Sequence, residues 1–496
     1  MLDVVISGGG PNGLLMACEL RLAGLRPVVL EALTEPSLEP KANGIMGQIV
    51  KLLHYRGLHE RYTGSSEPPK PTPYFLFGGL TLNMTLLDES PIHVLPVPQR
   101  QINKILEERA LELGVEIRRG HELVGLSQDD ESVTVEVQGP QGKYELRARY
   151  LVGADGAHSV TRKLCGIDFP GVTYSRTTLR TAHVSVPEDL VDKATGGLNV
   201  PGFGMVHAFV GVRTETGGFS YAPMPGLPPM LATTEWDEPE SDEPMTLDEL
   251  RESIRRVLGV DVPFGPPAGE GPHLLRRRRE GNTRLAERYR DRRVFLIGDA
   301  AHIYASGGSS LNVGMQDGIN LAWKLGVVLR GEADEDLLDT YEVERRPVAE
   351  RMITHGEAYS ALLAPGKDIT GLRALFTELM AKRDVVQVLA DWAAGCDIRY
   401  DIGDAHPLVG RFVPDSAPPP GSLTNARPIL VDSTGTLTAP DTVDTINAEI
   451  PGLTAILIRP DGYVAWASAS PDPDAAELAA VTRKWFGDSV RARLGV

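Results

Sequence analysis

The stretch LDVVISGGGPNG at residues 2–13 points to the fold class, because a short apolar run leads directly into closely spaced glycines. Residues 2–7 predict a buried strand, and residues 11–24 predict a helix that ends at Gly24. Residues 26–31 (RPVVLE) predict a second buried strand. This strand-helix-strand order is typical of a parallel sheet in an α/β, Rossmann-like domain.

The glycines Gly8, Gly10 and Gly13 have the GxGxxG spacing, and Glu31 ends the following strand. Such a motif uses its first glycine for the turn, its second for close approach to a pyrophosphate and its third for helix packing. The helix N-terminus attracts phosphate, and the acidic strand end accepts hydrogen bonds from a ribose. A glycine-rich turn without a ligand is the alternative, but this context favours a dinucleotide site.

Composition narrows the function classes. The chain has 496 residues, of which 42% are hydrophobic and 24% charged, so two or three ordinary globular domains are expected. The net charge of -17 disfavours general binding to nucleic acid or to anionic membranes. Three distant cysteines without a CxxC pair disfavour a disulfide scaffold or a zinc site. With no leader and no membrane-spanning run in the sequence, we expect a cytoplasmic location.

Further along the chain the predicted secondary structure changes twice. From about residue 172 to 265, strand-like runs separated by proline and glycine predict an antiparallel sheet. Residues 293–297 return to a buried strand, and residues 313–329 predict a long helix. A proline-rich break at residues 414–420 precedes a tail with three predicted strands and a helix, which indicates a small α/β domain.

Two acidic turns follow buried strands in this sequence. Asp155 lies in LVGADGAHS at residues 151–159, and Asp299 lies in VFLIGDAAH at residues 294–302. Ligands bind outside the carboxyl ends of parallel strands, so both carboxylates are candidates for contact with a polar cofactor chain. The glycine-bearing loop at residues 307–312 begins a helix, where free N–H groups attract negative charge. Taken singly, each residue could instead cap a strand or form a turn.

These three stretches, in this order, resemble the single-component (group A) flavoprotein aromatic hydroxylases. VGRFVPD at residues 409–415 and RPDGYVAW at residues 459–466 resemble the thioredoxin-like C-terminal domain of the polyketide and antibiotic hydroxylase subgroup. The resemblance implies a Rossmann-like FAD-binding domain of the p-hydroxybenzoate hydroxylase type at residues 1–171 and 275–394. An antiparallel β-sheet substrate domain would occupy residues 172–274, with residues 72–98 contributing to its sheet. A thioredoxin-like domain would occupy residues 395–496.

The resemblance also implies the chemistry. FAD would be the cofactor, NADPH or NADH the co-substrate, and molecular oxygen the oxidant of a small-molecule aromatic substrate. In this family a hydride passes to the flavin, and a flavin C4a-hydroperoxide then transfers oxygen to an activated ring, so no metal and no catalytic side chain are expected. The residues that would bind FAD are Gly8, Gly10, Pro11, Asn12, Gly13, Glu31, Lys41, Gln99, Val124, Asp155, Asp299, Gly308, Leu311 and Asn312. Candidate substrate-lining residues, each also explicable as core or surface, are His207, Phe219, Tyr221, Met224 and Trp236.

The chain departs from the family pattern in three places. Lys41 and Gln48 stand where arginines are usual, and the loop at residues 303–310 is one residue short. Compared with arginine, Lys41 keeps the positive charge but cannot form two parallel hydrogen bonds to a phosphate, and Gln48 has no charge. Two rivals therefore remain: a Baeyer–Villiger or purely reductive enzyme, and a flavin-binding protein without turnover. The four arginines at residues 276–279 indicate either an anion site or a solvated strand face, and we expect the latter.

Overall fold

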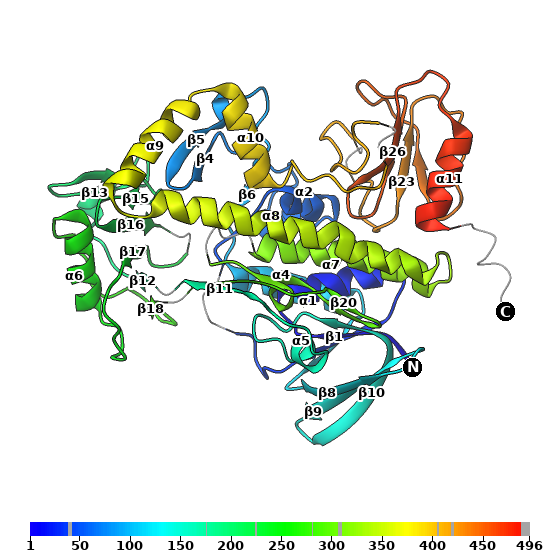
Figure 1. The fold of residues 1–496 in the computed structure, drawn as a ribbon, viewed down its shortest axis with the longest axis horizontal. Coiled ribbons are helices and arrows are strands. Elements are labelled where there is room, and N and C mark those ends of the chain that lie inside the picture. Colours follow the sequence, from blue (N-terminus) through cyan, green and yellow to red (C-terminus); the bar gives the residue numbers. More distant parts are fainter. Residues whose placement is uncertain are drawn as a thin grey trace.

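The computed structural model describes residues 1–37, 42–174, 176–223, 226–279, 281–305, 310–403, 406–417 and 421–487. Its central sheet has the strand order β20-β21-β10-β1-β2-β7, and β9 and β8 extend it from β10 (Figure 1). The strands are β1 (Leu2–Ser7), β2 (Pro27–Glu31), β7 (Glu116–Arg119), β8 (Glu122–Gln128), β9 (Val133–Gly139), β10 (Gly142–Gly153), β20 (Arg290–Asp291) and β21 (Val294–Leu296).

The core of this sheet is parallel, as its sequence predicts. β1 pairs in parallel with β2 and β10, and β10 pairs in parallel with β21. Three helices pack together beside it: α1 (Pro11–Leu22), α4 (Gln99–Glu112) and α7 (Ser310–Leu329). Parallel pairing brings the carboxyl ends of β1, β2, β10 and β21 to one edge, which positions the loops that follow them.

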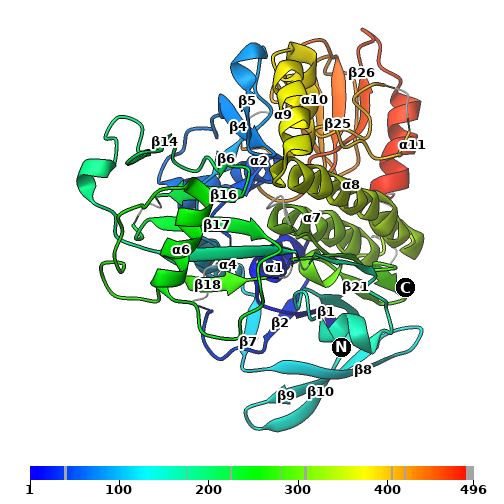
Figure 2. The same ribbon diagram turned by 60° about the vertical axis from the view of Figure 1, so that its left-hand side comes forward.

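A second sheet has the order β15-β16-β17-β12-β18, and all its pairs are antiparallel. It contains β12 (Thr177–His183), β15 (Val212–Arg213), β16 (Gly217–Ala222), β17 (Met230–Trp236) and β18 (Leu275–Arg278). Helix α6 (Leu247–Leu258) covers one face (Figure 2). The antiparallel sheet is therefore present, and its last strand lies just past residue 274, where we expected the domain to end.

Residues 72–98 do not join that sheet, so this expectation is wrong. Among the strands that the structure describes, β4 (Tyr74–Phe77) and β5 (Leu80–Asn83) pair only with each other, and β6 (Val94–Leu95) pairs with β3 (Ile45–Met46). The hairpin buries Phe77 and Leu82 against α8 (Thr340–Leu363) and α10 (Arg383–Ala394), beside α9 (Lys367–Leu379). Burial against helices, rather than strand pairing, satisfies its apolar side chains.

The tail forms a four-stranded mixed sheet with the order β24-β23-β25-β26. It contains β23 (Ile429–Asp432), β24 (Asp444–Ile446), β25 (Ala455–Ile458) and β26 (Val464–Ser468), with α11 (Ala475–Phe486) packed against it (Figure 1). β23 and β24 run in parallel, and β25 is antiparallel to both of its neighbours.

The remaining elements are short connections around these sheets. They include α2 (Gln48–Tyr55), α3 (His59–Thr63), α5 (Val160–Leu164), β13 (Leu198–Val200), β14 (Gly204–Val206), and the small sheet of β11 (Gly171–Tyr174), β19 (Gly281–Leu285) and β22 (His302–Ile303). Across the described ranges, none of the helices combines the length and the apolar character that a membrane crossing needs.

Candidate cofactor site

A cavity of about 1640 Å³ opens at the carboxyl ends of the parallel strands. It is far larger than a pocket for one drug-sized molecule, which is typically about 300–1,000 Å³. Residues from segments far apart in the sequence meet there. The predicted site residues that line it are Gly8, Gly10, Pro11, Asn12, Glu31, Gln99, Asp155, Asp299 and Leu311.

The three motif glycines have different surroundings. Gly8 has a φ of +110°, and a Cβ atom on it would stand 2.4 Å from the carbonyl oxygen of Ala154. A Cβ atom on Gly13 would stand 2.0 Å from the carbonyl oxygen of Gly8, so α1 can approach β1 only through a glycine. A Cβ atom on Gly10 would meet nothing within 4 Å. Gly8 and Gly13 are therefore required by the fold, whereas Gly10 leaves open space at the start of α1.

Glu31 is fixed at the end of β2. Its Oε2 accepts a hydrogen bond from the Gly9 N–H at 2.8 Å, and its Oε1 accepts one from the Leu33 N–H at 2.8 Å. A carboxylate has about four lone-pair sites, so each oxygen can accept a further bond from a ligand hydroxyl. The arrangement matches the task of a ribose-binding carboxylate.

Asp155 and Asp299 organise the two loops that the sequence singled out. Asp155 accepts hydrogen bonds from Ser159 Oγ at 2.5 Å and from the N–H and Oγ1 of Thr161 at 2.9 Å each. Asp299 accepts a hydrogen bond from the hydroxyl of Ser310, the first residue of α7. Both carboxylates thus hold a helix start and also face the cavity.

Arg162 connects these loops, and sequence reasoning did not assign it a role. It donates to the carbonyl oxygens of Ala300 at 2.8 Å and Ala157 at 3.0 Å, and its guanidinium lies 3.8 Å from the ring centre of Phe169. Its place in the short stretch that follows Asp155 was the only signal that could have pointed to it.

Of five further predicted residues, one lines the cavity, two lie beside it and two fall outside the described ranges. Gln99 lines it and exchanges backbone and side-chain hydrogen bonds with Ala42. Asn312 is buried and accepts a hydrogen bond from the Met46 N–H at 3.0 Å, so it anchors β3 rather than lining the cavity. The lining residue near Val124 is its neighbour Leu123. Lys41 and Gly308 lie outside the described residues.

Helix α4 contributes a polar wall that the sequence analysis missed. Arg100, Asn103, Lys104 and Glu107 line the cavity, and Glu107 pairs with Arg119 at 2.6 Å. Their spacing of three to four residues places them on one helix face, and this periodicity in residues 99–112 was an available signal. Arg100 and Lys104 add positive charge along the cavity.

Asn12 shows an unmet hydrogen-bonding capacity at the same site. Its side chain fits against Gly298 and Gly314, where a Cβ atom would stand 2.0 Å and 2.4 Å from its amide nitrogen. Its Oδ1 is buried without a hydrogen-bond partner among the described residues. An orphaned acceptor, the open space at Gly10 and two oriented carboxylates together fit a dinucleotide cofactor that carries hydroxyls and phosphates.

Comparison with known proteins identifies the family. A family model described as "FAD binding domain" matches residues 1–355, and one described as "Aromatic-ring hydroxylase, C-terminal" matches residues 406–489. The chain belongs to the FAD-dependent aromatic hydroxylases. It is an FAD-dependent monooxygenase, and NAD(P)H is the typical co-substrate of its family.

Relatives of this hydroxylase match almost end to end. The 12-dehydrotetracycline 5-monooxygenase/anhydrotetracycline 6-monooxygenase of Streptomyces rimosus is 38% identical and covers 98% of this chain and 99% of its own. A rifampicin monooxygenase of Streptomyces venezuelae is 37% identical, with the same coverage of both chains. The solved structure of the OxyS anhydrotetracycline hydroxylase from Streptomyces rimosus is similar with a TM-score of 0.82 at 36% identity, covering 98% of this chain and 99% of its own.

The hydroxylase places most of the expected substrate-lining residues away from the cavity. Phe219 and Tyr221 are each 2% exposed and pack against α6, so their expected role as lining residues is wrong. His207 is exposed and does not line the cavity. Trp236 is half-buried and lies, with its cross-strand partner Thr177, on the face of the sheet that does not contact α6. Met224 lies outside the described residues.

The reason is the two-residue period of a strand. Side chains at odd positions of β16 face α6, whereas even positions such as Ser220 face the other side. Arg276 and Arg278 of β18 line the cavity, and their cross-strand partners Thr181 and Leu179 share their face. Phe219 and Tyr221 therefore lie on the face of the sheet that points away from the cavity.

Gln48 has a structural role in this hydroxylase. It is 1% exposed, donates a hydrogen bond to the Gly395 carbonyl oxygen at 2.8 Å and accepts one from the Tyr463 hydroxyl at 3.3 Å. It thereby links α2 to the end of α10 and to the tail, and it does not line the cavity.

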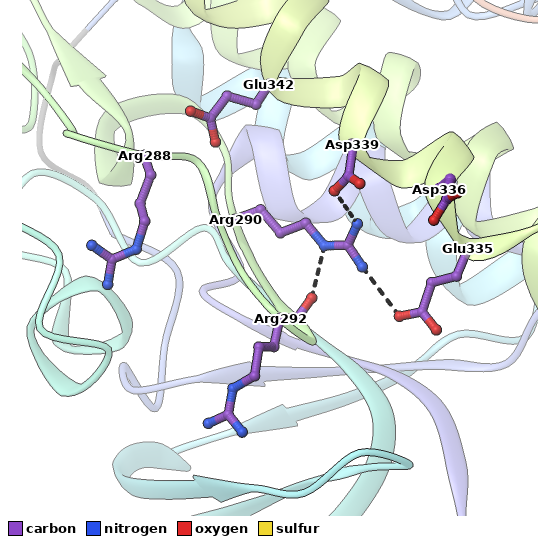
Figure 3. Close-up of a pocket in the computed structure, with 7 residues that line it drawn as sticks. All are labelled: Arg288, Arg290, Arg292, Glu335, Asp336, Asp339 and Glu342. Atoms are coloured by element: carbon purple, nitrogen blue, oxygen red, sulfur yellow. Dashed lines mark hydrogen bonds and ion pairs between the residues drawn. The ribbon is translucent and has the colours of Figure 1, made fainter.

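A second pocket of about 520 Å³ lies at the surface near β20, and Figure 3 shows that its walls are entirely charged. Arg290 bonds there to Asp339 at 2.5 Å and to Glu335 at 3.1 Å. These two ion pairs join β20 to the short 3-10 helix Glu335–Asp339, which directly precedes α8. Within the described part of the chain, no cluster of three potential metal ligands occurs.

Proposed function

We propose that this monooxygenase hydroxylates a polycyclic aromatic compound of the polyketide or antibiotic type, using NADPH or NADH and molecular oxygen. The observation that carries the proposal is the long cavity at the parallel strand ends, in a chain whose relatives are named for tetracycline-type and rifampicin substrates. Bound FAD supplies the redox and oxygen-transfer chemistry, so the protein's work is binding, orientation and exclusion of water.

Different cavity residues would bind different parts of FAD. We assign the adenosine ribose to Glu31, the pyrophosphate to the start of α1 at Gly10, Pro11 and Asn12, and the polar chain to Asp155 and Asp299. The exposed N–H groups at a helix start attract phosphate, and this supports the pyrophosphate assignment. The N–H groups near Leu311, at the start of α7, would lie at the flavin ring end of the cavity.

The aromatic substrate would lie on the cavity side of the antiparallel sheet. Ser220, Thr234 and Trp236 lie on this face, on β16 and β17, which β12 separates from the arginines of β18. This assignment keeps Trp236 and replaces Phe219 and Tyr221 with Ser220, from the opposite face of β16, and with Thr234 of β17.

Two further proposals concern the tail and the location. A mixed four-stranded sheet with one antiparallel strand supports a thioredoxin-like tail, and the absence of cysteine after Cys396 in the sequence argues against thiol redox chemistry there. Three free cysteines support a reducing, cytoplasmic location.

The function is tested with the purified holoenzyme. We expect a yellow protein whose FAD is reduced by NADPH without oxygen, and faster when anhydrotetracycline or rifampicin is present. With oxygen, one of these compounds should gain the mass of one oxygen atom as a hydroxyl group. A colourless protein that takes up no FAD, or reduction that no aromatic compound accelerates, would contradict the proposal.

The product of the same assay distinguishes a hydroxylase from a Baeyer–Villiger or reductive enzyme. The shortened loop at residues 303–310 is the one sequence feature that speaks for a Baeyer–Villiger or reductive enzyme. Tyr304 of this loop lines the cavity, and its buried hydroxyl has no hydrogen-bond partner among the described residues. A ring-expanded lactone would establish oxygen insertion, and a product with two added hydrogens would establish reduction.

A further inference from the structure

Tyr304 lines the large cavity within the stretch of chain that carries residues assigned to FAD. It follows β22 and lies between Asp299, assigned to the polar chain, and Leu311, assigned to the flavin ring end. All three residues line the cavity. The side chain of Tyr304 is therefore placed on the part of the wall that would hold the cofactor.

The ring of Tyr304 is held in one position by its neighbours. It stacks on the ring of His302, with the ring centres 5.4 Å apart and the planes at 21°. His302 is itself fixed, because its Nε2 bonds to the buried Asp317 at 2.7 Å. On the other side of Tyr304, the Ala305 N–H donates to Thr283 Oγ1 at 3.1 Å. The hydroxyl is thus carried by a ring that is oriented before any ligand binds.

The hydroxyl of Tyr304 is buried, and it has no hydrogen-bond partner among the described residues. Burial, and then the charge of Asp317, raise the pKa of Tyr304 well above its usual value, so the phenol stays protonated and can donate. The buried hydroxyl of Tyr341 shows the usual situation, because it donates to the Leu296 carbonyl oxygen at 2.7 Å. A buried donor without an acceptor is unfavourable, and an acceptor on a bound ligand would remove this penalty.

The ring of a flavin offers such an acceptor. Its pyrimidine part has two carbonyl oxygens, and reduction of the ring increases the negative charge that these oxygens share. A hydrogen bond to an acceptor becomes stronger as the acceptor gains charge. A fixed O–H donor beside one of these oxygens would therefore stabilise reduced FAD more than oxidised FAD.

We propose that the Tyr304 hydroxyl donates a hydrogen bond to a carbonyl oxygen of the flavin ring and thereby raises the reduction potential of the bound FAD. Its contribution is to bind and tune the cofactor. The inference rests on the proposed function, because it adds a contact to the FAD arrangement assigned there.

An oxygen of the substrate is the competing acceptor, because the antiparallel sheet also reaches this cavity. Arg276 and Arg278 line it, so the arginines at residues 276–279 do not form the single solvated strand face that we expected. In the chain, β18 is followed by β19, whose partner β22 leads into Tyr304. The position of Tyr304 among the FAD residues favours the flavin, and the two acceptors predict different measurements.

The test compares the wild type with Tyr304→Phe as purified holoenzymes without substrate. Phenylalanine retains the ring that stacks on His302, so only the hydroxyl is lost. We expect the reduction potential of the bound FAD to fall by about 30 mV, which for a two-electron couple is a tenfold change in the ratio of reduced to oxidised flavin. Anaerobic titration against a reference dye measures this potential, and the absorbance bands of the oxidised flavin should shift as well.

Tyr289→Phe is the matched control. The Tyr289 hydroxyl is also buried without a partner among the described residues, and its ring centre lies 6.2 Å from that of His302, but Tyr289 does not line the cavity. This variant should keep the wild-type potential and spectrum. An unchanged potential in Tyr304→Phe, or an equal fall in both variants, would overturn the inference.

Substrate binding distinguishes the competing acceptor. If Tyr304→Phe keeps the wild-type potential but binds anhydrotetracycline or rifampicin more weakly, the acceptor is on the substrate and the inference is wrong. A wild type that takes up no FAD would refute the proposed function itself. A yellow wild type whose potential does not depend on the Tyr304 hydroxyl would refute only this contact.

Discussion

Gly10 and Gly13 belong to one motif but have different physical requirements. Gly13 is closed in by the carbonyl oxygen of Gly8, whereas a methyl group on Gly10 would have no protein atom within 4 Å. Gly10 also has an ordinary negative φ of -74°, so its backbone does not require glycine. The demand for glycine at position 10 must come from the ligand.

Substitutions at these two glycines should therefore separate folding from cofactor binding. In Gly10→Ala we expect the free energy of unfolding of the apoprotein to fall by less than about 1 kcal/mol. Its FAD affinity should fall at least about tenfold, because a methyl group meets the pyrophosphate. In Gly13→Ala the apoprotein should lose about 1–3 kcal/mol or more through overpacking. Urea unfolding and FAD titration measure both, and equal stability losses in the two variants would contradict the distinction.

At the scale of elements, an aromatic cluster joins the β4–β5 hairpin to α8 and α10. The ring of His355 on α8 stacks on Phe77 of β4 at 5.3 Å and on Trp392 of α10 at 4.8 Å. Burial, together with the nearby Arg351 charge, lowers the pKa of His355 to about 4. The hairpin is thus held by a histidine that is neutral in the folded protein at neutral pH.

This cluster predicts a pH dependence of stability. Between about pH 4 and 6.5 the unfolded chain binds a proton at His355 and the folded protein does not, so stability falls as the pH falls through this window. The loss in unfolding free energy amounts to as much as about 3 kcal/mol.

His355→Phe keeps the aromatic stacking but has no group that binds a proton, so its unfolding free energy should fall less between pH 6.5 and 4. His207→Gln, at an exposed position, should leave the wild-type slope unchanged. Parallel slopes for wild type and His355→Phe would refute the assignment.

At the scale of the whole molecule, α8 connects the three parts of the chain. It runs between the antiparallel sheet and the tail (Figure 1). Glu344 of this helix bonds to Arg459 of the tail at 2.8 Å and 2.6 Å and to Lys324 of α7 at 2.8 Å, and all three side chains are buried. Burial alone would raise the pKa of Glu344, but the charges of Arg459 and Lys324 outweigh it and lower the pKa to about 2.

Removing this buried carboxylate should loosen the tail. In Glu344→Gln we expect a loss of about 3–5 kcal/mol in unfolding free energy, since the buried Lys324 loses its carboxylate and the buried Arg459 keeps only Asp461. Arg346→Gln on the same helix removes an exposed ion pair to Glu350 and should change stability by less than about 0.5 kcal/mol. Below the unfolded carboxyl pKa of 4.5, the advantage of the wild type over Glu344→Gln should shrink as the pH falls toward 2. Urea unfolding at several pH values checks both statements.

The parallel sheet, the glycine motif and the acidic strand ends at Glu31, Asp155 and Asp299 could all be predicted from the amino-acid sequence. Each of these depends on neighbours within about 20 residues, and local spacing is what a sequence displays. The cavity confirms that these segments, far apart in the chain, meet at one edge of the sheet.

Which sides of the strands face the cavity could be learned only from the folded molecule. The two-residue period separates Phe219 from Ser220 and Arg277 from Arg278, but it does not say which set meets α6. That choice follows from the carboxylates and apolar side chains that α6 presents, and the same kind of packing holds residues 74–83 against helices instead of in a sheet. Contacts between distant segments set these outcomes, and a local pattern does not contain them.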